Sequence, residues 1–213
     1  MNNEKRRGKK SKGLFFMGTG LLLILAAFFL VIYNWQDGQR AGKAARQMAE
    51  QLQEAVTAQT AADVSEDQEE MLPDYMLCPD MEMPVKTIEG VDYIGILTIP
   101  ALELELPVIS EWNYPNLKIA PCRYGGSAYL NNLIICGHNY RSHFGNLKHL
   151  TVGDLAFFTD TDGNTFTYKM VGQETLSKTS AEAMESGEWD LTLFTCTVGG
   201  KNRVTIRFRL EQN

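Results

Sequence analysis

The hydrophobic pattern divides the chain into an apolar N-terminal segment, a polar middle and a C-terminal part made of short apolar runs. Residues 14–33 carry no charged side chain and include the run F-F-M-G-T-G-L-L-L-I-L-A-A-F-F-L-V-I. About twenty apolar residues are enough to cross a hydrocarbon core as a helix. The run is longer than the apolar part of a typical signal peptide, and no A-x-A-like cleavage site follows it. We therefore predict an uncleaved transmembrane anchor over residues 14–35.

The charges that flank the apolar segment predict its orientation. Six lysine and arginine residues and one glutamate lie within residues 1–13, and Tyr33 and Trp35 stand where interfacial aromatic residues belong. The positive-inside rule keeps residues 1–13 in the cytoplasm as a basic tail. It places the rest of the chain outside the cell, on a single-pass membrane protein.

Residues 36–87 are predicted to form an extracellular stalk and an acidic linker. Residues 37–60 are rich in Ala, Gln, Glu, Lys and Arg, with apolar side chains at a loosely helical spacing. This favours a helix whose apolar face is too small to form a core by itself. Residues 61–86 are acidic and contain three prolines, which is typical of a solvated linker. The folded domain is then expected to occupy residues 88–213.

From residue 91 onward the pattern is that of β-strands. Apolar and polar side chains alternate in residues 102–106 and 204–209, whereas residues 133–136 are nearly all apolar, as in a central strand. Asp162-Gly163 is a hairpin signal. Two short segments favour helical turns, residues 115–118 and 181–188. Many short strands at regular spacing predict a mainly β domain, a barrel or a sandwich, with short helices.

The charge balance argues against nucleic acid as a partner. The net charge is −6, and the basic tail conceals a still more acidic remainder. Binding to phosphates needs clustered Lys and Arg, so we expect no nucleic-acid partner. Four acidic residues of the β region could bind calcium, but a solvated acidic face explains them better. They are Glu103, Glu105, Asp160 and Asp162.

The four cysteines are widely spaced and include no C-x-x-C pair; they are Cys78, Cys122, Cys136 and Cys196. Their spacing matches neither a zinc ribbon nor a disulfide framework. A bridge between Cys78 and Cys122 stays open for a domain outside the cell, and Cys196 should be free. The cysteines and neighbouring histidines match no usual metal-ligand spacing, so we expect no metal and no cofactor.

Cys196 is the candidate nucleophile. It ends the β-rich run L-T-L-F-T, and a Gly-Gly turn then leads to Arg203 at the start of an alternating strand. Upstream, the apolar run I-I-C-G delivers His138 at its exit, and a cysteine nucleophile needs such a base or imidazolium near it in space. A lone cysteine is more often buried and inert. The combination of Cys196 with His138 and Arg203 therefore carries the catalytic interpretation.

These motifs resemble those of the sortases, the cysteine transpeptidases of Gram-positive cell surfaces. L-T-L-F-T-C, an arginine at the head of the last strand and I-C-G-H-N upstream carry the resemblance, which covers residues 91–210. It implies an eight-stranded β-barrel and a thiol protease, a hydrolase that cleaves an LPxTG-like sorting signal between Thr and Gly. A thioacyl enzyme would then pass the acyl group to a cell-wall precursor amine. The implied partners are surface proteins with a C-terminal sorting signal and a peptidoglycan-precursor or pilin amine.

The resemblance also implies the role of each site residue. Cys196 is the nucleophile, His138 the acid and base, and Arg203 the cation that stabilises the oxyanion. An imidazolium favours the thiolate, and a guanidinium keeps its proton throughout. Thr195 and Asn139 are expected to line the substrate site.

Other residues compete for two of these roles. His143 and His149 are alternative bases or surface residues, but only His138 ends a strong strand. Arg207 and Arg209 lie on the same strand as Arg203, further from the turn that faces Cys196.

The resemblance leaves the class and the acceptor open. The loop H-F-G-N-L resembles class B sortases, whereas residues 170–191 are too few for the long helical insertion of that class. One alternative function is a pilin-polymerising sortase that uses a pilin lysine as the acceptor. Another is a surface-binding barrel without catalysis.

Overall fold

The computed structural model describes residues 4–63, 72–197 and 199–211. It consists of two compact units, Met1–Arg40 and Ala41–Asn213. Helix α1 (Glu4–Asp63) begins in the first unit and ends in the second. Within the described residues, its apolar part is the one helical segment long and apolar enough to span a membrane, and its most apolar stretch is wholly unburied. This exposure suits a segment whose natural surroundings are lipid.

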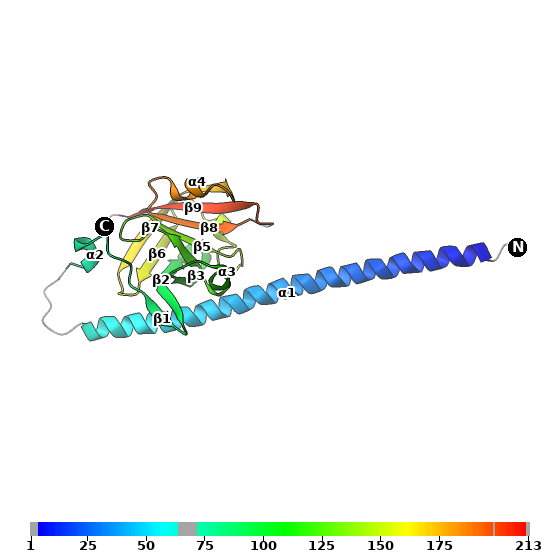
Figure 1. The fold of residues 1–213 in the computed structure, drawn as a ribbon, viewed down its shortest axis with the longest axis horizontal. Helices are drawn as coiled ribbons and strands as arrows, with labels where there is room; N and C mark the ends of the chain where they lie inside the picture. The colour runs from blue at the N-terminus through cyan, green and yellow to red at the C-terminus, as the bar shows by residue number, and fades with distance from the viewer. Residues whose placement is uncertain (1–3, 64–71, 198, 212–213) are drawn as a thin grey trace. The chain divides into compact units, whose positions relative to one another are not determined.

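The second unit is a closed β-barrel (Figure 1). The strands of the described part are β1 (Lys86–Ile88), β2 (Val91–Ile99), β3 (Leu104–Ile109), β4 (Cys122–Gly125), β5 (Leu133–Gly137), β6 (Leu155–Asp160), β7 (Thr165–Ser177), β8 (Leu191–Cys196) and β9 (Asn202–Leu210). Eight strands follow the order β2-β3-β4-β5-β8-β9-β7-β6, and β6 pairs back onto β2 to close the barrel. Strand β1 adds a short hairpin to β2. The predicted eight-stranded, mainly β fold is confirmed.

Short helices fill the connections, and two of them confirm predicted helical turns. They are α2 (Asp74–Leu77), α3 (Tyr114–Ile119), α4 (Ala181–Glu185) and the 3-10 turns η1 (Pro100–Leu102) and η2 (Leu147–His149). The Asn113 side chain caps α3 by accepting a hydrogen bond from the Asn116 amide at 2.7 Å. The connection from β7 to β8 contains only α4 among its described helices. The long helical insertion is therefore absent from this connection, as the sequence predicted.

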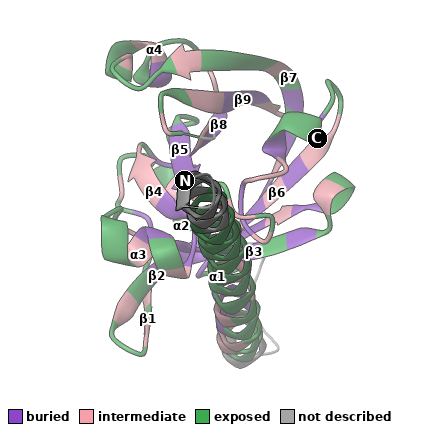
Figure 2. Cartoon of the chain, turned by 90° about the vertical axis from the view of Figure 1, so that its right-hand side faces the viewer, coloured by how far each residue is buried: buried purple, intermediate pink, exposed green. Residues whose placement is uncertain are grey.

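Alternation along the strands produces two hydrophobic clusters. The first fills the barrel and includes Leu193 and Ile206. The second lies on the outer face, where Cys136 and Phe194 of the strands meet Met184 of α4. Figure 2 shows buried residues along β5 and β8, two of the strands that contribute to this outer cluster. The outer face of β5 and β8 is thus covered rather than solvated, and a recess can form where the cover ends.

The C-terminal part of α1 packs against the barrel within the second unit. Its buried residues recur at a helical spacing: Ala41, Ala45, Met48, Ala49 and Leu52. At Gly42 the approach is close, because a Cβ atom built there would lie 2.6 Å from the Cβ of Ser142. Residues 64–71 of the predicted linker lie outside the described residues. The boundaries between anchor, stalk and catalytic domain stay predictions.

Two expectations about individual residues need correction or resolution. Asp160 is not part of a solvated acidic face, because it is fully buried. Its carboxylate accepts hydrogen bonds from the Tyr129 hydroxyl at 2.7 Å and from the backbone and side-chain amides of Asn164 at 2.9 Å. A disulfide between Cys78 and Cys122 does not form either, since Cys78 is exposed, Cys122 is buried and both are free.

Candidate active site

Three adjacent strands bring the predicted catalytic residues together. Cys196, the last residue of β8, pairs directly with Arg203 of the antiparallel strand β9. On the other side of β8, the parallel register with β5 pairs Thr195 with Gly137. His138 follows Gly137 directly, so one further step along the same register leads to Cys196. Neighbouring strands lie about 5 Å apart, so His138, Cys196 and Arg203 form a row with roughly this spacing between their backbones.

The side chains of Cys196, His138 and Arg203 lie on the same face of the sheet, as the alternation along the strands shows. Phe194 and Cys136 are paired residues of the outer cluster, and Cys196 and His138 each lie two positions further along their strands. Arg203 is the partner of Cys196 on β9. Because residues two apart share one face of a sheet, the three side chains belong to the outer face of the barrel.

A cavity of about 260 Å³ opens beside Cys196 and Arg203. Four aromatic residues form much of one side: Trp112, Tyr114, Tyr124 and Phe194. The connection from β7 to β8 forms another side and contributes Ser180, Ala181 and Met184. Lys178 and Arg203 are the charged residues of the lining, and no described carboxylate lines the cavity. Such a mostly apolar recess with a thiol and two cations suits a peptide segment with few charges.

Cys196 and Arg203 are both accessible from this cavity. The thiol is partly exposed and free, which confirms the prediction that Cys196 is unpaired. The Arg203 guanidinium is half-buried, and its Nη1 donates hydrogen bonds to the carbonyl oxygens of Gly200 at 3.3 Å and Asn202 at 3.2 Å. The turn between β8 and β9 therefore holds the guanidinium at the head of β9.

His138 lies at the exit of β5 and is half-buried. Its carbonyl oxygen accepts a hydrogen bond from the Phe144 amide at 3.0 Å, which folds the following loop back onto the strand end. Its ring packs against Tyr140 with 4.8 Å between centroids, and Tyr140 packs in turn against His143 at 5.6 Å. His138 itself is outside the cavity lining, although the preceding residue, Gly137, belongs to it.

His143 is fully buried, so it is not the surface residue that one alternative expected. Neither ring nitrogen has a hydrogen-bond partner by geometry among the described residues. Burial lowers the pKa of His143 to about 4; the charge of His138 adds to this effect, and a backbone contact with Ala41 opposes it. His143 is therefore neutral at physiological pH. His149, the other alternative base, is exposed in η2.

Of the two predicted substrate-binding residues, one lines the cavity and the other does not. Thr195 lines the cavity and is buried, and its hydroxyl has no hydrogen-bond partner among the described residues. Asn139 is exposed and does not belong to the cavity lining. Cys136 is buried, and burial raises the pKa of its thiol to about 12. Cys136 is thus a core residue that also lines the cavity.

The sequence predicts a helical turn near α4, but it does not indicate that α4 or the aromatic side of the cavity belongs to the site. Trp112 and Tyr114 lie in a connection with no motif of its own, and Met184 is one apolar residue in a polar stretch. Their relation to Cys196 depends on packing across the sheet. Only the cluster of aromatic residues before and within β4 offered a signal. In the described part of the chain, no group of three His, Cys, Asp or Glu residues is placed to hold a metal ion.

Comparison with solved structures gives the class of protein that this barrel defines. The sortase D5 transpeptidase of Clostridium perfringens is 18% identical, with a TM-score of 0.57 over 80% of this chain and 99% of that one. Sortase C1 of Streptococcus agalactiae is 21% identical, with a TM-score of 0.52 over 75% and 86%. Sortase C-3 of Streptococcus pneumoniae is 21% identical, with a TM-score of 0.50 over 83% and 90%. The barrel therefore has the sortase fold.

The family follows from a sequence match. The family model of the sortase domain matches residues 97–211, which is more than half of the chain. The chain belongs to the sortase family. A search of curated proteins finds no match to it.

Proposed function

We propose that this chain is a membrane-anchored sortase that cleaves an LPxTG-like sorting signal and transfers the acyl part to a cell-wall precursor amine. The observation that carries the proposal is the row of His138, Cys196 and Arg203 across β5, β8 and β9, beside a cavity of about 260 Å³. The three residue types supply a nucleophile, a proton carrier and a permanent cation, which is what acyl transfer from a peptide requires.

In the first half of the reaction, the Cys196 thiolate attacks the carbonyl carbon of the scissile peptide bond. Negative charge develops on the carbonyl oxygen, where the Arg203 guanidinium stabilises it without losing a proton. The C–N bond then breaks, and the His138 imidazolium gives its proton to the leaving amine. The products are a thioester on Cys196 and the released C-terminal fragment.

In the second half, an acceptor amine attacks the thioester and His138 takes up the proton that the amine loses. The C–S bond breaks, the new amide leaves and the thiolate returns. No cofactor is required in this sequence. Thr195 lies in the lining beside the nucleophile and would contact the substrate, and Asn139 is proposed to contact it from the loop after His138.

The anchor has a role in this proposal. The basic tail and the apolar part of α1 support a single span with the N-terminus in the cytoplasm. The barrel would then meet sorting signals and precursor amines on the outer side of the membrane, where both are available to a tethered enzyme.

The test is the intact mass of the full chain, kept in detergent, after incubation with a panel of LPxTG-like and NPxTG-like peptides. We expect an acyl adduct that Cys196→Ala abolishes and that the matched variant Cys78→Ala retains, since Cys78 is also a free and exposed thiol. A precursor-like amine should then discharge the adduct. Discharge only by a lysine-bearing pilin peptide would favour the pilin acceptor, and no adduct with any peptide would favour a barrel that binds without catalysis.

A further inference from the structure

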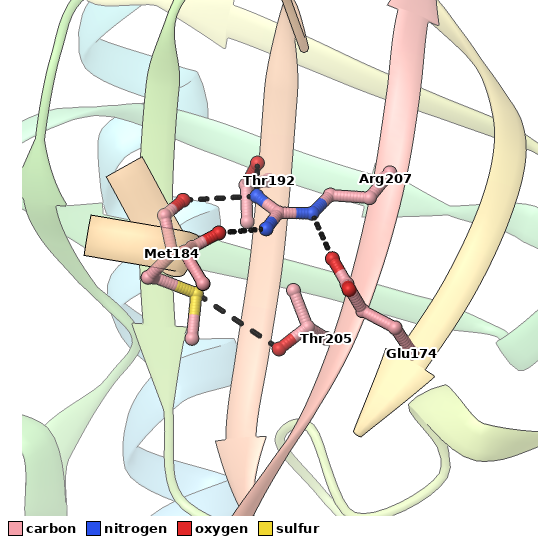
Figure 3. A network of polar contacts seen from close by, with 6 residues as sticks. Glu174, Met184, Thr192, Thr205 and Arg207 are labelled. Atoms are coloured by element: carbon pink, nitrogen blue, oxygen red, sulfur yellow. Dashed lines mark hydrogen bonds and ion pairs between the residues drawn. The ribbon is translucent and has the colours of Figure 1, made fainter. Parts of the chain in front are cut away.

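Arg207 is a buried cation on the same strand and face as Arg203. Only 3% of it is exposed, and it makes four hydrogen bonds. Nε donates to the Glu174 carboxylate at 2.8 Å, and Nη1 donates to the Thr192 hydroxyl at 2.9 Å. Nη1 also donates to the Met184 carbonyl at 2.9 Å, and Nη2 to the Ala183 carbonyl at 2.6 Å. Figure 3 shows the guanidinium between β8, the Glu174 side chain and α4.

The two carbonyl acceptors belong to α4, a helix too short to be stable by its own hydrogen bonds. Helix α4 has five residues, and hydrogen bonds from Met184 to Ser180 and from Ser186 to Glu182 close its turns. The last carbonyls of any helix lack partners within the helix. At α4 the guanidinium supplies partners for two of them, and a cation is also the favoured charge at a helix C-terminus.

Helix α4 is in turn a wall of the candidate active site. Met184 is buried, lines the cavity and lies in the outer cluster with Phe194. Its sulfur accepts a hydrogen bond from the Thr205 hydroxyl at 3.9 Å. Ala181, at the start of α4, lines the cavity as well. The position of this wall relative to Cys196 therefore depends on what fixes α4 to the barrel.

Arg207 is unsuited to a direct role at the thiol. It lies four residues from Arg203 along β9, which is roughly 13 Å in an extended strand. Its cross-strand partner is Thr192, whereas that of Arg203 is Cys196. Its hydrogen bonds go to α4, Thr192 and Glu174, and Arg207 is not among the residues that line the cavity.

We propose that Arg207 is a positioning residue that sets the width of the cavity beside Cys196 by fixing α4 to β8 and β9. The proposal rests on the proposed function, in which this cavity binds the substrate. Arg207 acts on the binding of the sorting signal through the wall that Ala181 and Met184 form. It does not take part in the transfer of the acyl group.

The test compares Arg207→Lys with Thr192→Val in the full chain. Lysine keeps a cation near Glu174 but cannot bind both carbonyls of α4 as a planar fork does. Valine in place of Thr192 removes one hydrogen bond of Arg207 and leaves both bonds to α4. We expect Arg207→Lys to raise KM for the peptide that acylates the wild type by about tenfold or more, the scale of one lost charged hydrogen bond, with kcat nearly unchanged. Thr192→Val should leave KM within about twofold.

A second measurement does not depend on catalysis. Hydrogen exchange of the amides in residues 180–187 should accelerate in Arg207→Lys and stay at the wild-type rate in Thr192→Val, while iodoacetamide labels Cys196 at the same rate in both. If Arg207→Lys does not fold, the charge-matched double variant R207Q/E174Q replaces it, because neither charge is then left alone. Equal effects of the two single variants, an effect on kcat alone, or unchanged exchange would overturn the positioning role.

These outcomes separate this inference from the proposed function. A wild-type protein that forms no acyl adduct contradicts the proposed function, while the hydrogen-exchange comparison still tests whether Arg207 fixes α4. A wild type that is acylated normally, together with an Arg207→Lys variant whose KM and exchange are unchanged, contradicts only the role of Arg207.

Discussion

Cys196 and Arg203 are direct cross-strand partners in the antiparallel pair formed by β8 and β9. The backbone register of the two strands therefore places a cation next to the thiol. On the opposite side of β8, the parallel pairing with β5 leads to His138 by the same principle. A sheet in which β5, β8 and β9 are neighbours therefore brings His138, from a distant part of the chain, to the hairpin that carries Cys196 and Arg203.

Replacing Arg203 by lysine tests whether the fork of the guanidinium matters beyond its charge. We expect Arg203→Lys to lower kcat/KM for acylation by about 10²-fold or more, because lysine lacks the planar fork that we propose stabilises the oxyanion. The thermal midpoint should hardly change, since the Arg203 guanidinium donates hydrogen bonds to the carbonyl oxygens of Gly200 and Asn202, which both lie in its own turn. Stopped-flow acylation with intact-mass detection would give the rates.

Arg209→Lys is the matched control for that experiment. Arg209 lies on the same strand, but it pairs loosely with Glu188 at 3.6 Å and Asp190 at 3.7 Å, away from Cys196. The acylation rate of Arg209→Lys should stay near that of the wild type. A wild-type rate in Arg203→Lys, or an equal loss in both variants, would argue against an oxyanion role for Arg203.

The four thiols should react very differently with iodoacetamide in the folded protein. Cys78 is exposed and Cys196 partly exposed, whereas Cys122 and Cys136 are buried. Burial also raises the pKa of both buried thiols, that of Cys136 to about 12, so little of either is thiolate at neutral pH. Peptide mapping after a short exposure should find Cys78 and Cys196 modified, and the other two only after unfolding. Labelling of Cys136 at the rate of Cys196 would contradict the buried position of β5.

Much of the barrel could be predicted because its signals are local. Alternation marked β9, the continuous apolar run of residues 133–136 marked β5, and Asp162-Gly163 marked the hairpin between β6 and β7. The approximate positions of α3 and α4 followed from short helical patterns. Cys196 and His138 can be proposed as site residues from sequence because Cys196 ends β8 and His138 directly follows β5, and a strand end is visible in the sequence.

The rest depends on contacts between distant segments that no local pattern encodes. Arg207 could not be told from Arg209 by sequence, since both alternate with apolar residues on β9. The difference lies in α4, because its carbonyl oxygens accept hydrogen bonds from Arg207, whereas Arg209 forms ion pairs with Glu188 and Asp190. The burial of Asp160 is not visible in a local pattern either, because one of its partners, Tyr129, is 31 positions away in sequence.

The buried imidazole of His143 should make stability depend on pH. Its pKa is about 4 in the folded chain and 6.5 without the fold, so between these values the unfolded chain binds the proton more readily. Stability from this group is fully present above pH 6.5 and is lost as the pH falls toward 4. The loss reaches about 3 kcal/mol for a shift of this size.

A neutral replacement isolates that contribution. In His143→Gln, the free energy of unfolding should fall less between pH 7.5 and pH 4.5 than in the wild type. His149→Gln, which changes an exposed histidine of η2, should keep the wild-type slope. Denaturant unfolding at a series of pH values would measure all three proteins. Parallel curves for the wild type and His143→Gln would contradict the lowered pKa.

The contact between α1 and the loop after β5 can be tested at Gly42. Alanine is favoured over glycine inside a helix by about 1 kcal/mol, yet a Cβ at Gly42 would meet the Cβ of Ser142 at 2.6 Å. Overpacking of this kind costs about 1–3 kcal/mol, so we expect Gly42→Ala to lower the thermal midpoint. Gly20→Ala is the control in the same helix, because nothing lies within 4 Å of a Cβ there. If both variants unfold at the wild-type temperature, α1 does not pack closely at Ser142. If only Gly42→Ala is destabilised and its acylation also slows, the helix contributes to holding the loop that carries His138.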